Sequence, residues 1–130
     1  MSLDTVLYTR LTTFAGLTAL IENRVYARNE LPQGAVLPAV SFMRAGVERV
    51  SAMGVDTGLA RARIQVDAWA STYDGVRAVA EQLRLALQRW RNATGTVVQD
   101  TYVLTELDLY ETETRLHRVM FDFDVVYVEG

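Results

Sequence analysis

The sequence predicts one α+β domain over residues 1–130, with element order α-β-β-α-β-β. Apolar residues recur at helical spacing in two segments and alternate at strand spacing in four others. Half of the residues are apolar and 22% are charged, as in ordinary globular domains. We therefore expect a mainly antiparallel four-stranded sheet with two helices packed on one face, because such a sheet can leave its other face to solvent.

The first predicted helix lies at the N-terminus. Apolar residues follow one another at steps of three and four from Leu3 to Ile21, and Ser2 or Asp4 can supply the start signal. Gly16 is expected to split the segment into a helix over 3–14 and a helical turn to about residue 23. Residues 24–38 contain both prolines of the chain and are predicted to be a crossing loop.

Two strands are predicted next, over 39–49 and 59–70. Pro38 stands at the start of the first, where a sheet tolerates a residue without a backbone N–H. The intervening segment, about 46–58, is rich in glycine and is expected to be a hairpin loop. One face of the second strand carries small residues that leave room for a helix: Ala60, Ala62, Ala68 and Ala70.

The second helix follows immediately. Ser71 and Asp74 form a pattern like a capping box, and Arg77 and Glu81 are spaced for an ion pair on the outer helix face. Residues 92–96 end the helix. Two further strands, about 97–110 and 116–128, are joined by the charged turn ETETR, so the last third of the chain is predicted to be a β-hairpin.

Charge and motifs exclude several functions. The net charge is -3, and the 13 cationic residues are all arginine and scattered, which argues against sequence-specific nucleic-acid binding. No apolar run approaches the roughly 20 residues of a membrane span, and the N-terminus lacks signal-peptide character. The absence of cysteine and of nucleotide, P-loop and zinc-protease motifs predicts no cofactor, no metal site and no enzymatic activity.

The acidic residues leave one alternative function open. Five carboxylates could share the open face of the sheet, namely Asp67, Glu106, Asp108, Asp122 and Asp124. A small metal-dependent enzyme or ligand-binding domain would use Asp67, Asp122 and Asp124. The favoured interpretation is that such acids pair across strands with Arg61, Arg63 and Arg118. His117 cannot join them, because odd and even positions of one strand point to opposite faces.

Apolar residues outside the predicted core indicate a binding surface. The predicted 46–58 loop carries Val47, Val50, Met53 and Val55, which either contact a partner or fold back on the domain. Trp69 falls on the polar side of its strand. It either covers the open face within the chain or anchors a neighbouring subunit, and intrachain cover is slightly favoured.

Five segments, in this order and spacing, resemble the tail-completion, or tail-to-head joining, proteins of long-tailed phages and prophages. They span nearly the whole chain: LTALIENRVYA (17–27), LPAVSF (37–42), IQVDAWA (64–70), GVRAVAEQLRLAL (75–87) and RVMFDFDVVY (118–127). The resemblance extends to six individual positions, and it implies a role for them in the fold or in an interface and not in catalysis: Arg24, Val25, Tyr26, Pro38, Asp67 and Trp69.

The resemblance implies a virion protein that is made in the host cytoplasm. Such proteins form a ring, usually a hexamer, on the last ring of the tail tube, where they stop tube growth and meet the head connector or a head-closure protein. No cofactor is implied. We add the hypothesis that the acids of the ETET turn, Glu111 and Glu113, face a lumen through which DNA slides, because like charges repel phosphate.

Overall fold

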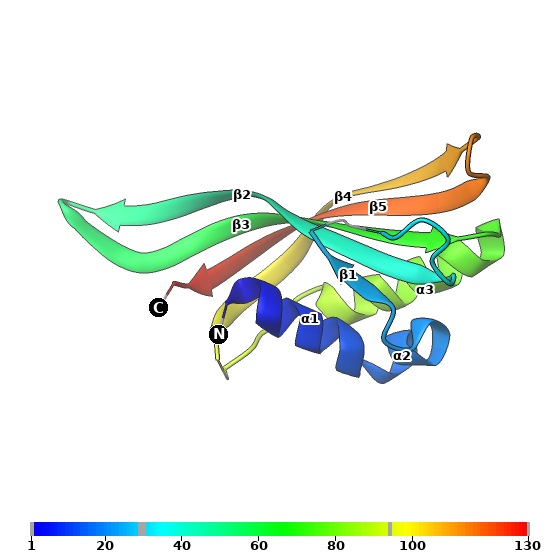
Figure 1. Cartoon of the computed structure of the whole chain (residues 1–130). Coiled ribbons are helices and arrows are strands. Elements are labelled where there is room, and N and C mark those ends of the chain that lie inside the picture. The colour runs from blue at the N-terminus through cyan, green and yellow to red at the C-terminus, as the bar shows by residue number, and fades with distance from the viewer. Residues whose placement is uncertain (1, 29–30, 94, 130) are drawn as a thin grey trace.

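The structure is a computed structural model that describes residues 2–28, 31–93 and 95–129, without the side chains of Ala52, Val55 and Asp56. These residues form three helices that cover one face of a five-stranded sheet (Figure 1). The helices are α1 (Leu3–Thr13), α2 (Ala15–Ile21) and α3 (Tyr73–Leu87). The strands are β1 (Val25–Ala27), β2 (Ala39–Ala52), β3 (Val55–Ala70), β4 (Val98–Glu111) and β5 (Leu116–Val128).

The sheet has the order β1-β2-β3-β5-β4 and is mixed, so the predicted count of four strands is wrong. The additional strand, β1, lies inside the predicted crossing loop and runs parallel to β2, with Val25 opposite Val40. Three residues are too short for an alternation signal. Their strand conformation depends on pairing with β2, where the Val40 N–H donates to the Arg24 carbonyl at 3.0 Å.

The N-terminal segment is divided into two helical parts, as the sequence predicted, but the break is at Phe14 rather than at Gly16. Ser2 caps α1 by accepting a hydrogen bond from the Thr5 N–H, and the extended Phe14 both ends α1 and precedes α2. Gly16 instead permits close packing, because a Cβ at this position would lie 2.9 Å from the side-chain carbon of Gln82 on α3. The helix count is therefore three rather than two.

Helix α3 begins one residue later than the capping pattern predicted. Thr72, not Ser71, is its N-cap, and the Thr72 hydroxyl accepts from the Gly75 N–H at 3.0 Å. Gly75 makes this cap possible, since a Cβ there would lie 2.7 Å from the Thr72 hydroxyl oxygen. Both residues are good caps by type, so the choice between them depends on this contact.

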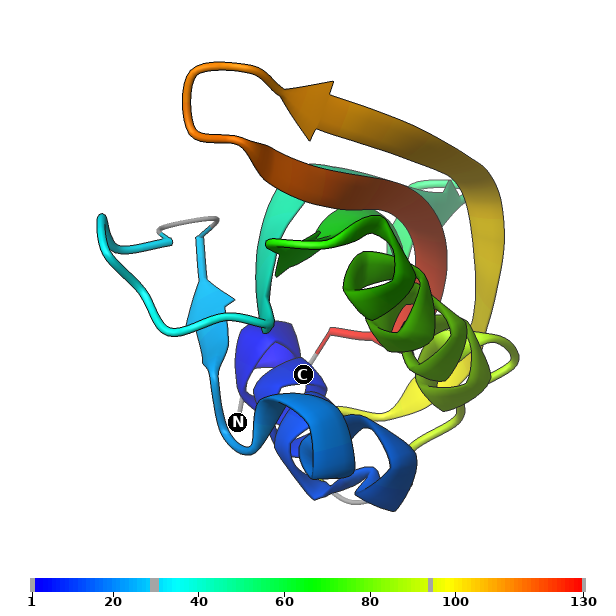
Figure 2. The same cartoon turned by 90° about the vertical axis from the view of Figure 1, so that its right-hand side faces the viewer.

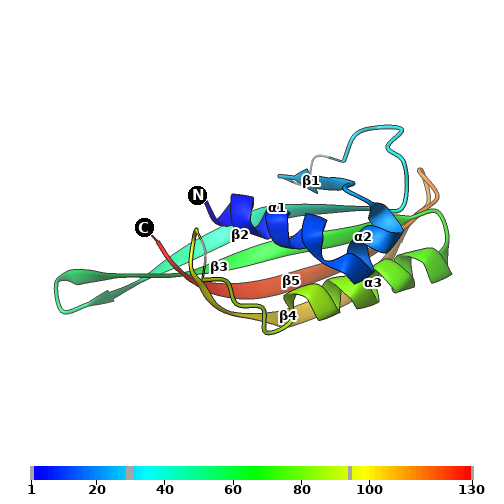
Figure 3. The same cartoon turned by 90° about the horizontal axis from the view of Figure 1, so that it is seen from below.

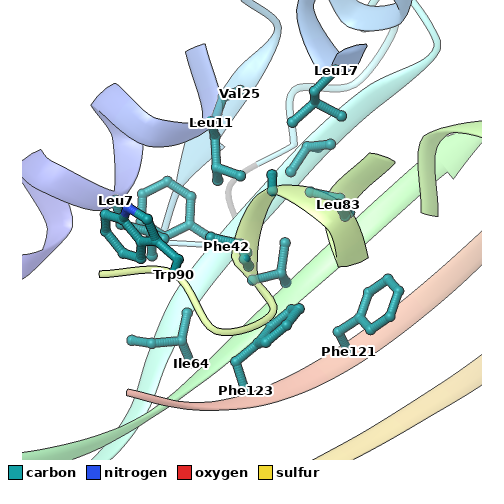
Figure 4. Packing of buried hydrophobic residues seen from close by; sticks show 14 of the residues in the cluster. Leu7, Leu11, Leu17, Val25, Phe42, Ile64, Leu83, Trp90, Phe121 and Phe123 are labelled. Atoms are coloured by element: carbon teal, nitrogen blue, oxygen red, sulfur yellow. The ribbon is translucent and has the colours of Figure 1, made fainter. Parts of the chain in front are cut away.

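The core lies between the helices and the face of the sheet that the alternation predicted. Ala60, Ala62 and Ala68 on β3 are fully buried, and their small side chains let the helices approach closely. Figure 3 shows the three helices lying across this face. Figure 4 shows the interior, where leucines from α1, α2 and α3 meet aromatic residues of the strands: Leu7, Leu11, Leu17, Leu83, Phe42, Phe121 and Phe123.

Two hairpins extend from the helix-covered body in opposite directions (Figure 1). Strands β2 and β3 remain paired as far as Ala52 and Val55, so the predicted 46–58 loop is wrong; it is a two-stranded arm. Bulges after Arg44 and Arg49 interrupt the alternation there, which hides the strand in the sequence. At the other end the β4–β5 hairpin curves past α3 (Figure 2).

Candidate assembly surfaces

Trp69 lies on the open face of the sheet, yet it is only 8% exposed. Its indole N–H donates to the Ser41 hydroxyl at 2.9 Å, and the Arg118 guanidinium lies over the indole, 4.8 Å from the ring centroid. Both partners come from neighbouring strands, since Trp69 is paired with Arg118 on β5 and Ser41 lies on β2. The indole therefore covers the open face within its own chain.

A buried ion pair lies beside the indole. Asp67 has no exposed surface, and its Oδ2 accepts from Arg118 at 3.0 Å and from Gln65 at 3.1 Å. Burial raises the pKa of Asp67, and the Arg118 charge opposes this shift. Removal from water destabilises an unpaired charge. The attraction of Arg118 is the main interaction that offsets this cost for the Asp67 carboxylate.

The five acids considered for metal binding do not share one face. Glu106 and Asp108 lie on the helix side of β4, where both accept from Arg77 of α3 at 2.9 Å. Asp124 is on the open face and pairs with Arg61 at 3.3 Å. Within the described ranges no group of three or more His, Cys, Asp or Glu residues could hold a metal ion.

Two local predictions about these charges had different outcomes. Arg77 forms its ion pairs with β4 and Glu81 forms its ion pair with Arg84, while the Arg77 charge only helps to lower the pKa of Glu81. His117 lies on the helix side against Tyr73 and Tyr110, away from Asp122, as strand parity predicted.

The arm presents the apolar residues singled out in the sequence, but unequally. Met53 at its tip is fully exposed and Val50 is 48% exposed. Val47 is half-buried and packs against the core. The side chain of Val55 lies outside the described part of the chain. Val50 and Met53 are therefore the arm residues best placed to contact a partner.

A second apolar surface lies on edge strand β4. Its outer half exposes 41–51% of four large side chains: Leu104, Leu107, Leu109 and Tyr110. The sequence does not reveal this surface, because the alternation of β4 resembles that of an internal strand and only the strand order makes β4 an edge. A groove of about 670 Å³ adjoins the end of the strand and is lined by Leu31, Pro32, Leu37, Trp69, Glu111 and Leu116.

The turn between β4 and β5 carries the predicted lumen acids. Glu113 is exposed, whereas Glu111 is half-buried and lies 3.6 Å from Arg118. Thr114 donates to the Glu111 carboxylate at 3.3 Å. Glu111 therefore takes part in the Trp69 cluster, and Glu113 is the acid that projects freely into solvent.

The arm and the edge of β4 are thus the candidate assembly surfaces of this chain. Residues 5–128 match the family described as Tail completion protein gp17. The chain belongs to this family. A tail-completion protein is a structural component of the phage tail, and the virion is its location. Among the helices described, none has the length and apolar character needed to cross a membrane.

A solved structure supports the fold. The chain superposes with a TM-score of 0.80 on a chain of the structure titled "Virion of native gene transfer agent (GTA) particle". The alignment covers 99% of this chain and 96% of that chain at 21% identity, so it shows a shared fold and not shared individual contacts. No curated protein matches the sequence.

Proposed function

We propose that this tail-completion protein forms a ring, a hexamer, on the head-proximal end of the tail tube. The ring ends tube growth and presents the surface that meets the head connector or a head-closure protein. The observation that supports this proposal is the exposure of large apolar side chains at two separate places on one sheet, the β4 edge and the β2–β3 arm. A subunit with two different surfaces assembles head to tail, and such contacts close into rings.

Two physical arguments favour an assembled protein over a free monomer as the functional state. An exposed apolar edge strand invites uncontrolled strand pairing unless something covers it. A two-stranded ribbon such as the arm is marginally stable in water without further packing. Contacts with neighbouring copies or with the tube would remove both liabilities.

Particles that lack this protein are expected to make tails longer than normal that remain separate from heads. The physical reason is that an uncapped tube end continues to offer a subunit-binding surface. Electron microscopy measures tail length and head attachment, and native mass spectrometry of wild-type protein on isolated tubes is expected to find six copies at one end. Supplying the wild-type gene in trans is the control. Tails of normal length without the protein would contradict the terminator role.

We also propose that the β4–β5 turn faces the DNA passage. Reversing the charge of Glu113 with Glu113→Arg is expected to slow DNA delivery, because an arginine ring in the lumen would bind phosphates. Glu113→Gln is the matched control, and infectious titre per assembled particle is the measurement. Glu111→Arg is less informative, since it also breaks the contact with Arg118. Unchanged titre for both Glu113 variants would remove the lumen role.

A further inference from the structure

The outer edge of β4 has a covered half and an open half. In the covered half the Thr101 carbonyl accepts from the Arg89 N–H at 2.6 Å, and the Val103 N–H donates to the Gln88 side chain at 2.9 Å. Thr101 and Val103 both pair with odd-numbered residues of β5. Residues of β4 that are paired in this way therefore point their backbone N–H and C=O groups away from β5, toward the outside of the sheet. In the open half the same register continues through Glu106, Asp108 and Tyr110. No residue in the described ranges hydrogen-bonds to their outward backbone groups.

Strand β2 also has an open outer edge. Strand β1 covers this edge only from Val40 to Phe42. The Val40 N–H donates to the carbonyl of Arg24, just before β1, so the backbone groups of Val40 point outward from β2. The same positions of β2 pair with even-numbered residues of β3. Beyond β1 they are Arg44, Val47 and Arg49. No residue in the described ranges hydrogen-bonds to the outward backbone of Arg44 or Val47, so the open edge of β2 continues past the end of β1.

The two edges fit each other in direction and in face. Three antiparallel steps separate β2 from β4, so the two strands run in opposite directions within one subunit. A second copy placed beside the first with its helices on the same side, and shifted along the strands until its arm is level with the open half of β4, would bring its β2 antiparallel to β4. The outward positions of both edges carry side chains on the helix face, since Val47 is paired with Ala62 and Asp108 with Val119. Their side chains would meet on one face, as a sheet requires.

Charge selects this pairing over a symmetric one. The β2 edge carries Arg44 and Arg49, and the β4 edge carries Glu106 and Asp108. Pairing β4 with β4, or β2 with β2, would place like charges opposite each other, which is destabilising. Arg77 brings a single positive charge to the two acids of β4, and Glu129 brings a single negative charge to the arginines of the β2 edge. Opposite charges thus remain on the two edges.

We propose that β4 of one subunit pairs antiparallel with the β2 edge of the next copy, so that one sheet continues from subunit to subunit around the ring. This inference rests on the proposed ring and specifies the contact that closes it. The heterologous edge-to-edge contact buries the exposed leucines of β4 against the arm.

Engineered disulfides test the contact directly, because the chain contains no cysteine. Val47→Cys is combined in one chain with Glu106→Cys, Asp108→Cys or Tyr110→Cys. Within a subunit these edges are three strand spacings apart, roughly 14 Å. A disulfide needs Cα atoms within about 7 Å, so any bond formed joins two subunits. The matched controls combine Val47→Cys with Leu107→Cys or Leu109→Cys, which point to the open face.

The variants are assembled on isolated tail tubes, oxidised and separated under denaturing conditions. One helix-face pair is expected to convert most chains into a ladder of covalent oligomers that reaches the full ring, and the open-face controls are expected to remain single chains. Rings without a disulfide at any helix-face pair, or cross-linking of the controls instead, would overturn the edge contact but leave the ring intact. Wild-type protein that forms no ring on tubes would instead refute the proposed function.

A second measurement does not depend on disulfide geometry. Arg44→Glu is expected to abolish ring formation on tubes, because it places an acid opposite the acids of β4. Arg63→Glu is the matched control, since Arg63 is also exposed but lies on the open face. Full ring formation by Arg44→Glu, or equal loss with Arg63→Glu, would contradict the proposed pairing.

Discussion

Replacing Trp69 by alanine is expected to lower the free energy of unfolding of the monomer by about 3–5 kcal/mol. The indole is 8% exposed and fills space between β2 and β5 on the open face. Its removal leaves a cavity, deprives Ser41 of a donor and deprives Arg118 of the ring on which it lies. Urea denaturation of the monomer, followed by far-ultraviolet circular dichroism, measures the loss.

Two milder variants separate the contributions of the indole. Trp69→Phe keeps an aromatic ring against Arg118 but loses the hydrogen bond and part of the buried ring surface, so it is expected to cost about 1–2 kcal/mol, less than Trp69→Ala. Ser41→Ala removes the acceptor of this hydrogen bond, leaves the indole in place and should cost a similar amount. A Trp69→Ala protein with the wild-type unfolding midpoint that forms no ring on tail tubes would show that Trp69 is a subunit anchor instead.

Arg118→Ala is expected to destabilise the monomer by about 3–5 kcal/mol, because it leaves the Asp67 carboxylate buried without a cation. Asp67 has no exposed surface, and Arg118 is its ion-pair partner. Asp67→Asn should cost less, since an amide still accepts from Arg118 and carries no charge into the interior. Arg61→Ala is the matched control, because Arg61 is exposed and its pair with Asp124 should contribute about 1 kcal/mol or less.

The loss in Arg118→Ala is expected to grow as pH rises. Burial already holds the pKa of Asp67 above its ordinary value of 3.8, and removing Arg118 raises that pKa further. A folded-state pKa above the unfolded value means that the folded state binds more protons between the two values, so stability falls as pH rises through that window. Chemical denaturation at about pH 4.5 and about pH 7.5 measures the difference. A deficit independent of pH would mean that Arg118 acts by packing alone.

Local patterns predicted the regular elements where the periodic signal was long. The alternation of β3 and β5 correctly assigned the core face, and the apolar stripe of α3 correctly assigned its buried side. Short or irregular signals failed. Three residues of β1 have no periodicity of their own, and the bulges in β2 made the arm resemble a loop.

Ion pairs between residues far apart in the chain were also not predictable from local spacing. Spacing on a helix suggested that Arg77 would bind Glu81, yet it binds Glu106 and Asp108, which are 29 and 31 residues away in the chain. A local i,i+4 pair contributes only about 0.2–0.5 kcal/mol, so a convergent pair of acids from a neighbouring strand easily replaces it. Glu106 and Asp108 therefore lie on the helix side of the sheet, apart from Asp67, Asp122 and Asp124 on the open face.

The sequence by itself determined the α+β class, the buried faces of β3 and β5 and the family to which the chain belongs, because these depend on residue type and spacing along the chain. Only the tertiary structure decided that β4 is an edge, that the 46–58 segment is a projecting arm and that Trp69 lies against Arg118. The physical reason is that an edge is defined by the absence of a neighbouring strand, and strand order is set by contacts between residues far apart in sequence. The surfaces available to a partner follow from that order.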